Sequence, residues 1–213
     1  MSSKVPAPPL PGSLHPLFFT WEKDRPLFRC HSVRFGPTAF NPGKGLGRFH
    51  PFPDPGGSVV PVLYAAENLE GALSETVFHS VPFQDPGKRI RRITLEPLVV
   101  STLICDRDLR LVQLFGFGLR RLGVTRLRLI EARKRQYRRT AAWAQALHAC
   151  DESIDGLIWV SRQNDGTRSV VLLGDRVSAS SLRCIDGPSP LKEGPGYDAV
   201  IRAADQAGIV IFE

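Results

Sequence analysis

Five polar residues interrupt segments that are otherwise apolar or rich in glycine: Arg29, Arg48, Tyr64, Glu75 and Ser161. Together these types could act on a charged substrate, because guanidinium groups bind phosphates in bidentate fashion and a carboxylate stabilises developing positive charge. Each residue also has an ordinary structural role, as a salt-bridged arginine, a core tyrosine, a solvated glutamate or a strand-end hydroxyl. Taken one at a time, the structural roles are favoured.

Common catalytic motifs offer no alternative assignment. Residues 43–47 (Gly-Lys-Gly-Leu-Gly) lack the spacing of dinucleotide-binding and Walker loops, and a proline-rich segment rather than a helix follows them. The five histidines are dispersed without a paired motif, so no metal site is expected. Ser161 lacks the flanking glycines of a nucleophile elbow, so a serine hydrolase is not indicated.

Hydrophobic periodicity predicts the elements that must position the first three of these residues. Apolar runs over residues 27–33 and 59–65 are typical of strands, and they carry Arg29 and Tyr64. Between them, residues 37–57 contain too much proline and glycine for a helix or a central strand. Arg48 is therefore expected on a long loop.

The segment around Glu75 has the pattern of an amphipathic helix. Asn68 offers an N-cap, and apolar residues then recur at helical spacing from Leu69 to Val77. At 100° per residue, Glu75 falls on the flank of that apolar stripe. The core therefore leaves its carboxylate accessible.

Strand patterns outnumber helical ones in the rest of the chain. We expect strands over residues 89–95 and 109–114, a turn or short helix over 116–123, a helix with Thr140 as its N-cap, and a hairpin of strands 157–161 and 168–173. Helices and strands do not alternate regularly, which favours an α+β fold over a doubly wound parallel sheet.

Length and composition restrict the class of protein. A chain of 213 residues with 42% hydrophobic and 23% charged residues fits one globular domain, predicted over residues 21–213 after a proline-rich, extended leader over residues 1–20. The densest apolar runs last only four residues, so the chain does not cross a membrane. Four scattered cysteines predict reduced thiols and a cytoplasmic location.

Positive charge is concentrated in one part of the chain. Residues 88–139 contain 15 Lys or Arg against 4 Asp or Glu, a local charge of +11, whereas the remainder carries −4. Such a segment could contact nucleic acid, an acidic protein or a phosphate-bearing ligand. A solvated arginine-rich face is an equally good explanation.

Several short motifs occur in an order that resembles one known family. They are Phe28-Arg29, then residues 45–49 (Gly-Leu-Gly-Arg-Phe), 63–66 (Leu-Tyr-Ala-Ala), 72–75 (Ala-Leu-Ser-Glu), 137–146 (Tyr-Arg-Arg-Thr-Ala-Ala-Trp-Ala-Gln-Ala) and 155–162 (Asp-Gly-Leu-Ile-Trp-Val-Ser-Arg). This series resembles the RES domain family, named for an arginine, a glutamate and a serine. The resemblance covers most of the chain.

The resemblance implies both a fold and a function. RES proteins are typically bacterial toxins of toxin–antitoxin pairs, with a mainly antiparallel, ADP-ribosyltransferase-like sheet and flanking helices, and they consume NAD+ as a substrate. By this resemblance Arg29, Tyr64, Glu75 and Ser161 line an NAD+ pocket with Arg48 nearby, and Thr140 is a second candidate for the hydroxyl. A cognate antitoxin of the helix-turn-helix type would be the partner, and the oligomeric state stays open.

The chemistry of NAD+ cleavage suits these residue types. Breaking the bond between nicotinamide and ribose passes through an oxocarbenium-like transition state, which a carboxylate such as Glu75 would stabilise. Arg29 and Arg48 would hold the pyrophosphate, and Tyr64 would offer an aromatic face to nicotinamide. The residues leave open whether water, phosphate or a protein side chain accepts the ribosyl group, so a protein mono-ADP-ribosyltransferase is one alternative. A nucleic-acid-binding module that uses residues 88–139 is another.

Overall fold

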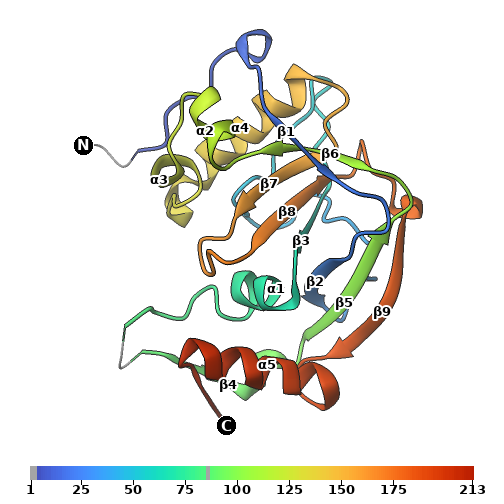
Figure 1. The fold of residues 1–213 in the computed structure, drawn as a ribbon, viewed down its shortest axis with the longest axis vertical. Coiled ribbons are helices and arrows are strands. Elements are labelled where there is room, and N and C mark those ends of the chain that lie inside the picture. The colour runs from blue at the N-terminus through green and yellow to red at the C-terminus, as the bar shows by residue number, and fades with distance from the viewer. Residues whose placement is uncertain (1–3, 85–86) are drawn as a thin grey trace.

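The protein is built on a strongly curved eight-stranded sheet with the strand order β1-β6-β7-β8-β3-β2-β5-β9 (Figure 1). The computed structural model describes residues 4–84 and 87–213. The strands of this sheet are β1 (Phe18–Trp21), β2 (Leu27–Ser32), β3 (Val62–Ala66), β5 (Leu98–Cys105), β6 (Leu109–Gln113), β7 (Gly156–Val160), β8 (Arg168–Leu173) and β9 (Leu182–Pro190).

Most neighbouring strands run antiparallel. In the large sheet the parallel pair is β6 with β7, and a separate small ribbon pairs β4 (Arg89–Arg91) in parallel with β10 (Val210–Phe212). The predicted hairpin is confirmed, because β7 and β8 pair directly in antiparallel register. The predicted α+β class with a mainly antiparallel sheet is therefore confirmed as well.

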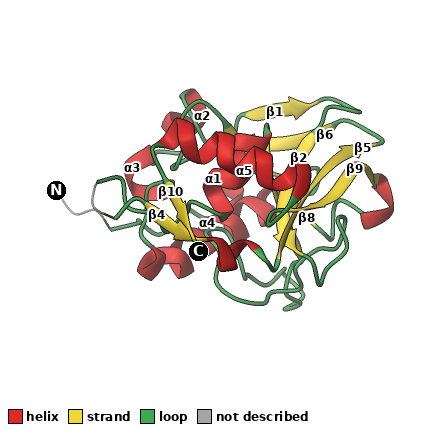
Figure 2. Cartoon of the chain, turned by 90° about the horizontal axis from the view of Figure 1, so that it is seen from below, coloured by secondary structure: helices red, strands yellow, loops and turns green. Residues whose placement is uncertain are grey.

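In the part of the chain that the structure describes, five α-helices flank the sheet in two groups. They are α1 (Leu69–Thr76), α2 (Phe117–Arg121), α3 (Arg126–Leu129), α4 (Tyr137–Cys150) and α5 (Gly194–Ala207). Helices α2, α3 and α4 pack on one half of the molecule, whereas α1 and α5 pack together at the other (Figures 1 and 2). In the described residues, the helices fall short of the length and apolar character that a membrane span requires.

The two faces of the curved sheet have different partners. On one face, side chains from different strands of the curved sheet pack against one another, for example Leu27, Leu63 and Leu103 from three strands. The other face supports the helices, for example where Trp159 of β7 and Trp143 of α4 share a core. Burial of these apolar side chains stabilises the fold and fixes which residues of each strand face the helices.

The described part of the proline-rich leader, residues 4–20, packs on the domain and contains a short 3-10 helix at Pro11–Ser13. Val5 is fully buried, Trp143 Nε1 donates to the carbonyl of Pro6 at 2.9 Å, and Arg139 donates to the carbonyl of Val5 at 3.0 Å. Strand β1 crosses the predicted boundary between leader and domain at residues 20 and 21. The leader therefore contributes to the core that α4 helps to form.

Two local predictions are corrected by the structure. The expected strand over residues 89–95 ends at Arg91, and a short 3-10 helix (Arg92–Leu95) follows, because Leu95 turns into the core beside α5. Thr140 is not an N-cap, since α4 begins one turn earlier at Tyr137. The predicted cap at Asn68 is confirmed, and its side chain accepts a hydrogen bond from Gly71 N at 2.8 Å.

Candidate active site

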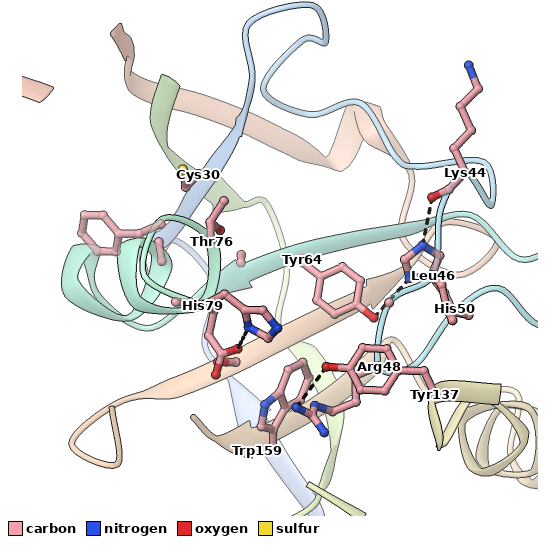
Figure 3. A pocket seen from close by; sticks show the side chains of 17 residues that line it. Cys30, Lys44, Leu46, Arg48, His50, Tyr64, Thr76, His79, Tyr137 and Trp159 are labelled. Atoms are coloured by element: carbon pink, nitrogen blue, oxygen red, sulfur yellow. Dashed lines mark hydrogen bonds and ion pairs between the residues drawn. The ribbon is translucent and has the colours of Figure 1, made fainter. Parts of the chain in front are cut away.

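A cavity of about 360 Å³ lies between α1, β3 and the loop that precedes β3 (Figure 3). Its lining includes three of the predicted site residues, Arg48, Tyr64 and Glu75, which are distant in sequence. The volume is within the range of small-molecule sites. The predicted loop, strand and helix thus meet at one place.

Glu75 projects from the last turn of α1, and its two carboxylate oxygens have different environments. Oε1 accepts hydrogen bonds from Ser161 Oγ at 2.6 Å and from Arg162 N at 3.1 Å. Oε2 lies 3.8 Å from Nδ1 of His79, an electrostatic contact that is too long for a hydrogen bond. Burial alone would raise the pKa of Glu75, but His79, Ser161, Arg48 and Arg162 N–H together lower it. Glu75 is therefore a carboxylate at neutral pH.

Ser161 lies outside the cavity lining, contrary to the prediction, but its hydroxyl contacts Glu75 and orients it. The residue is fully buried, immediately after the end of β7. Its hydroxyl donates to Glu75 and accepts from the backbone N–H groups of Gln163 at 3.0 Å and Asn164 at 3.1 Å. These three bonds use the donor and both acceptor positions of the hydroxyl, so Ser161 acts through Glu75.

Arg48 is a buried cation that lies against the cavity wall, with 5% of its surface exposed. Its guanidinium donates to the carbonyl of Ala132 at 3.1 Å and to the hydroxyl of Tyr137 at 3.4 Å, and it lies over the Tyr137 ring (Figure 3). Burial lowers the pKa of Arg48. No carboxylate among the described residues forms an ion pair with it, and its two hydrogen bonds use two of five N–H groups.

Tyr64 connects β3 to the loop that carries Arg48. Its hydroxyl accepts from Phe49 N at 3.1 Å and lies 3.3 Å from Nδ1 of His50. Burial raises the pKa of the Tyr64 hydroxyl, which stays neutral. A side chain at Gly47 would overlap the His50 ring and lie 3.0 Å from the Tyr64 hydroxyl, so this loop requires glycine there. The Gly-Arg-Phe motif thus packs closely on Tyr64.

Arg29 does not line this cavity, contrary to the prediction. Alternation along β2 directs Phe28 and Cys30 toward the cavity and Arg29 toward the opposite face. There the guanidinium donates to the carbonyls of Pro37 at 2.5 Å and Ala39 at 2.8 Å. Burial lowers the pKa of Arg29 to about 10. Arg29 secures the start of the long loop.

Thr140 also lies outside the cavity lining. Its buried hydroxyl interacts with the carbonyl of Arg48 and donates to the carbonyl of Tyr137 at 3.0 Å. Between the two candidate hydroxyls, the structure places that of Ser161 beside Glu75. Thr140 instead ties α4 to the loop that carries Arg48.

Several cavity residues had no role assigned from the sequence. They are His79, Tyr137, Trp159, His50 and Lys44. Tyr137 and Trp159 belong to motifs that carry the family resemblance. His79 follows the end of α1, four residues after Glu75, and this spacing is the available signal for it. Figure 3 shows the Lys44 side chain extending away from the other labelled residues.

Comparisons with known proteins agree with the architecture. A comparison with protein-family models matches residues 26–191 to the RES domain. The chain belongs to the RES domain family. A search of curated proteins gives no match. Among solved structures, this RES protein is similar to a chain of the M. tuberculosis MbcT–MbcA toxin–antitoxin complex, with a TM-score of 0.58 and 13% identity over 78% of this chain and 84% of that chain.

The basic segment over residues 88–139 of this RES protein does not form a single surface. Strand β4, with its arginines, pairs with the C-terminal β10, whereas α2 and α3 lie at the other end of the molecule (Figure 1). Arg107 is engaged in a bidentate pair with Asp155 at 2.6 and 2.9 Å. Arg110 pairs with Asp151 at 2.8 Å. The concentration of charge in sequence is therefore dispersed in space.

Proposed function

We propose that this RES protein cleaves NAD+ between nicotinamide and ribose. The observation that carries the proposal is one cavity that contains both an ionised carboxylate, Glu75, and a buried guanidinium, Arg48, with donors to spare. A substrate with an anionic pyrophosphate and a sugar that becomes cationic complements this pair of charges.

Each cavity residue would have a defined part in the reaction. Oε2 of Glu75 would hydrogen-bond a ribose hydroxyl and stabilise the oxocarbenium-like transition state, while Ser161 and Arg162 N–H hold Oε1. The remaining N–H groups of Arg48 would bind a phosphate oxygen pair. Tyr64 and Trp159 would offer aromatic faces to nicotinamide. Nicotinamide leaves as a neutral molecule, so no strong general acid is needed.

The biological setting that we propose is a toxin–antitoxin pair. Membership of the RES family and the fold shared with the MbcT–MbcA structure support a toxin whose cognate antitoxin covers the cavity or its entrance. The acceptor would be water or phosphate. Retention of label from NAD+ on a protein target would instead identify a mono-ADP-ribosyltransferase.

The test is nicotinamide release from NAD+ by purified protein. We expect Glu75→Gln to lower the rate by about 10²- to 10³-fold, the usual cost of losing one preorganised electrostatic group. Glu70→Gln is the matched control, because Glu70 is an exposed carboxylate on the same helix. Undiminished release by Glu75→Gln, or absence of release by the wild type, would overturn the proposal.

A further inference from the structure

Arg126 lies outside the cavity but contacts the strand end that carries Ser161. It is the first residue of α3, and its guanidinium donates to the carbonyl of Ser161 at 2.9 Å and more weakly to that of Val160 at 3.4 Å. Its Nε donates to Glu131 at 3.0 Å, so the fork is held from the other side as well. One side chain thus fixes two consecutive carbonyls at the end of β7.

Two donors to Glu75 depend on this short segment. Ser161 Oγ and the N–H of Arg162 both donate to Oε1 of Glu75, at 2.6 and 3.1 Å. The peptide that joins these two donors contains the carbonyl of Ser161, which Arg126 holds. Rotation of that peptide would turn the Arg162 N–H away from the carboxylate. Because Arg126 also donates to the carbonyl of Val160, it holds the peptides on both sides of Ser161, and a shift of both would displace the Ser161 hydroxyl as well. The position of Arg126 therefore bears directly on the geometry of Glu75.

We propose that Arg126 is a positioning residue for Glu75, acting through the peptide between Ser161 and Arg162. The kinetic part of this inference rests on the proposed function, whereas its geometric part does not. A guanidinium suits the role because its planar fork can donate to two neighbouring carbonyls, which the single ammonium of lysine does less well. Pairing with Glu131 reduces the rotational freedom of the fork.

Loss of Arg126 should change how Glu75 titrates. Titratable side chains that face Glu75 come from three elements: His79 after α1, Arg48 on the loop and Tyr64 on β3. Hydrogen bonds from Ser161 and Arg162 N–H lower the pKa of the Glu75 carboxyl. Weakening both bonds removes part of that stabilisation of the ionised form, so the pKa rises toward its ordinary value.

The experiment compares Arg126→Gln and Arg126→Lys with Arg128→Gln. Arg128 lies two residues further along α3 and carries the same charge, so it controls for the loss of a cation from this helix. Nicotinamide release gives kcat and KM, and ¹³C NMR follows titration of the Glu75 carboxyl, assigned with Glu75→Gln. We expect Arg126→Gln to lower kcat by about 10- to 100-fold with KM changed less than about threefold. Arg126→Lys should recover only part of this loss.

The two readouts separate this inference from the proposed function. Equal kcat and equal Glu75 titration in Arg126→Gln and Arg128→Gln would overturn the positioning role. A wild-type protein that releases no nicotinamide would overturn the proposed function, and an upward shift of the Glu75 titration in Arg126→Gln would still support the positioning role. Comparable thermal unfolding of the two variants would show that the comparison concerns folded protein.

Discussion

Of the two carboxylate oxygens of Glu75, one is held by hydrogen bonds within the protein and the other is available to a ligand. Oε1 is held by Ser161 and by the N–H of Arg162, whereas Oε2 faces His79 across 3.8 Å in the cavity. Such a division suits a catalytic carboxylate, because the interactions that orient it do not occupy the oxygen that acts. The lowered pKa of Glu75 also keeps that oxygen charged without any change in conformation.

Replacement of Ser161 by alanine should change the pH dependence of the proposed reaction. The hydroxyl favours the ionised form of Glu75, so its loss raises the pKa of that carboxyl. Activity requires the carboxylate, and the acid limb of the profile of kcat/KM should therefore move to higher pH. A pH series of nicotinamide release measures this shift.

Ser74→Ala, next to Glu75 on α1, is the control for that series. Its acid limb should coincide with that of the wild type. An acid limb that is identical in Ser161→Ala and wild type would show that the hydroxyl does not control the ionisation of Glu75.

Residue type alone does not show which of the two arginines predicted for the pocket, Arg29 or Arg48, lines the cavity. Both lie beside phenylalanine in short motifs, and both are nearly fully buried. Only Arg48 lines the cavity. Residue type alone could not separate them, because a buried guanidinium serves equally well to hold an anion or to hold backbone carbonyls.

At the level of the element, strand alternation decides the position of Arg29. Leu27 belongs to the core inside the curved sheet, so Arg29, two residues on, faces the same side, and Phe28 and Cys30 face the cavity. This could have been deduced from the sequence once residues 27–33 were assigned to a strand. The missing information was which face of that strand would meet the helix that carries Glu75.

Replacement of Arg29 by methionine should reduce stability rather than chemistry. The change removes the donors to two carbonyls, those of Pro37 and Ala39, and a buried unsatisfied polar group costs about 1–3 kcal/mol. Urea unfolding measures the loss, with Arg34→Met as the control because Arg34 is exposed nearby. Unchanged stability with nicotinamide release reduced to the level of Glu75→Gln would instead place Arg29 at the ligand.

Local patterns predicted several elements well. Strand β2, helix α1 with its cap at Asn68, and the β7–β8 hairpin follow from periodicity and turn residues. The predictions of a strand over residues 92–95 and of an N-cap at Thr140 were wrong, because tertiary contacts determine both segments. Leu95 packs in the core beside α5, and the hydroxyl of Thr140 contacts the carbonyl of Arg48. No strand was assigned to β5 or β9, which pair with each other over most of their length.

At the scale of the whole molecule, the cavity forms because the topology brings distant segments of the chain together. Its walls come from α1, β3 and the loop around Arg48, and from the first turn of α4, so contacts between distant parts of the chain create it. The order of the motifs suggested that these parts meet, but no spacing in the sequence specifies how. The same topology disperses the basic segment, with β4 and α3 at opposite ends of the molecule (Figure 1).

The most direct test of the account is a crystal structure of the protein with an NAD+ analogue that carries a methylene group in place of the ribose ring oxygen and resists cleavage. We predict that its nicotinamide lies against Tyr64 and Trp159, that a ribose hydroxyl contacts Oε2 of Glu75, and that a phosphate contacts Arg48. Binding of the analogue away from this cavity, or with Glu75 and Arg48 on no common ligand, would contradict the account.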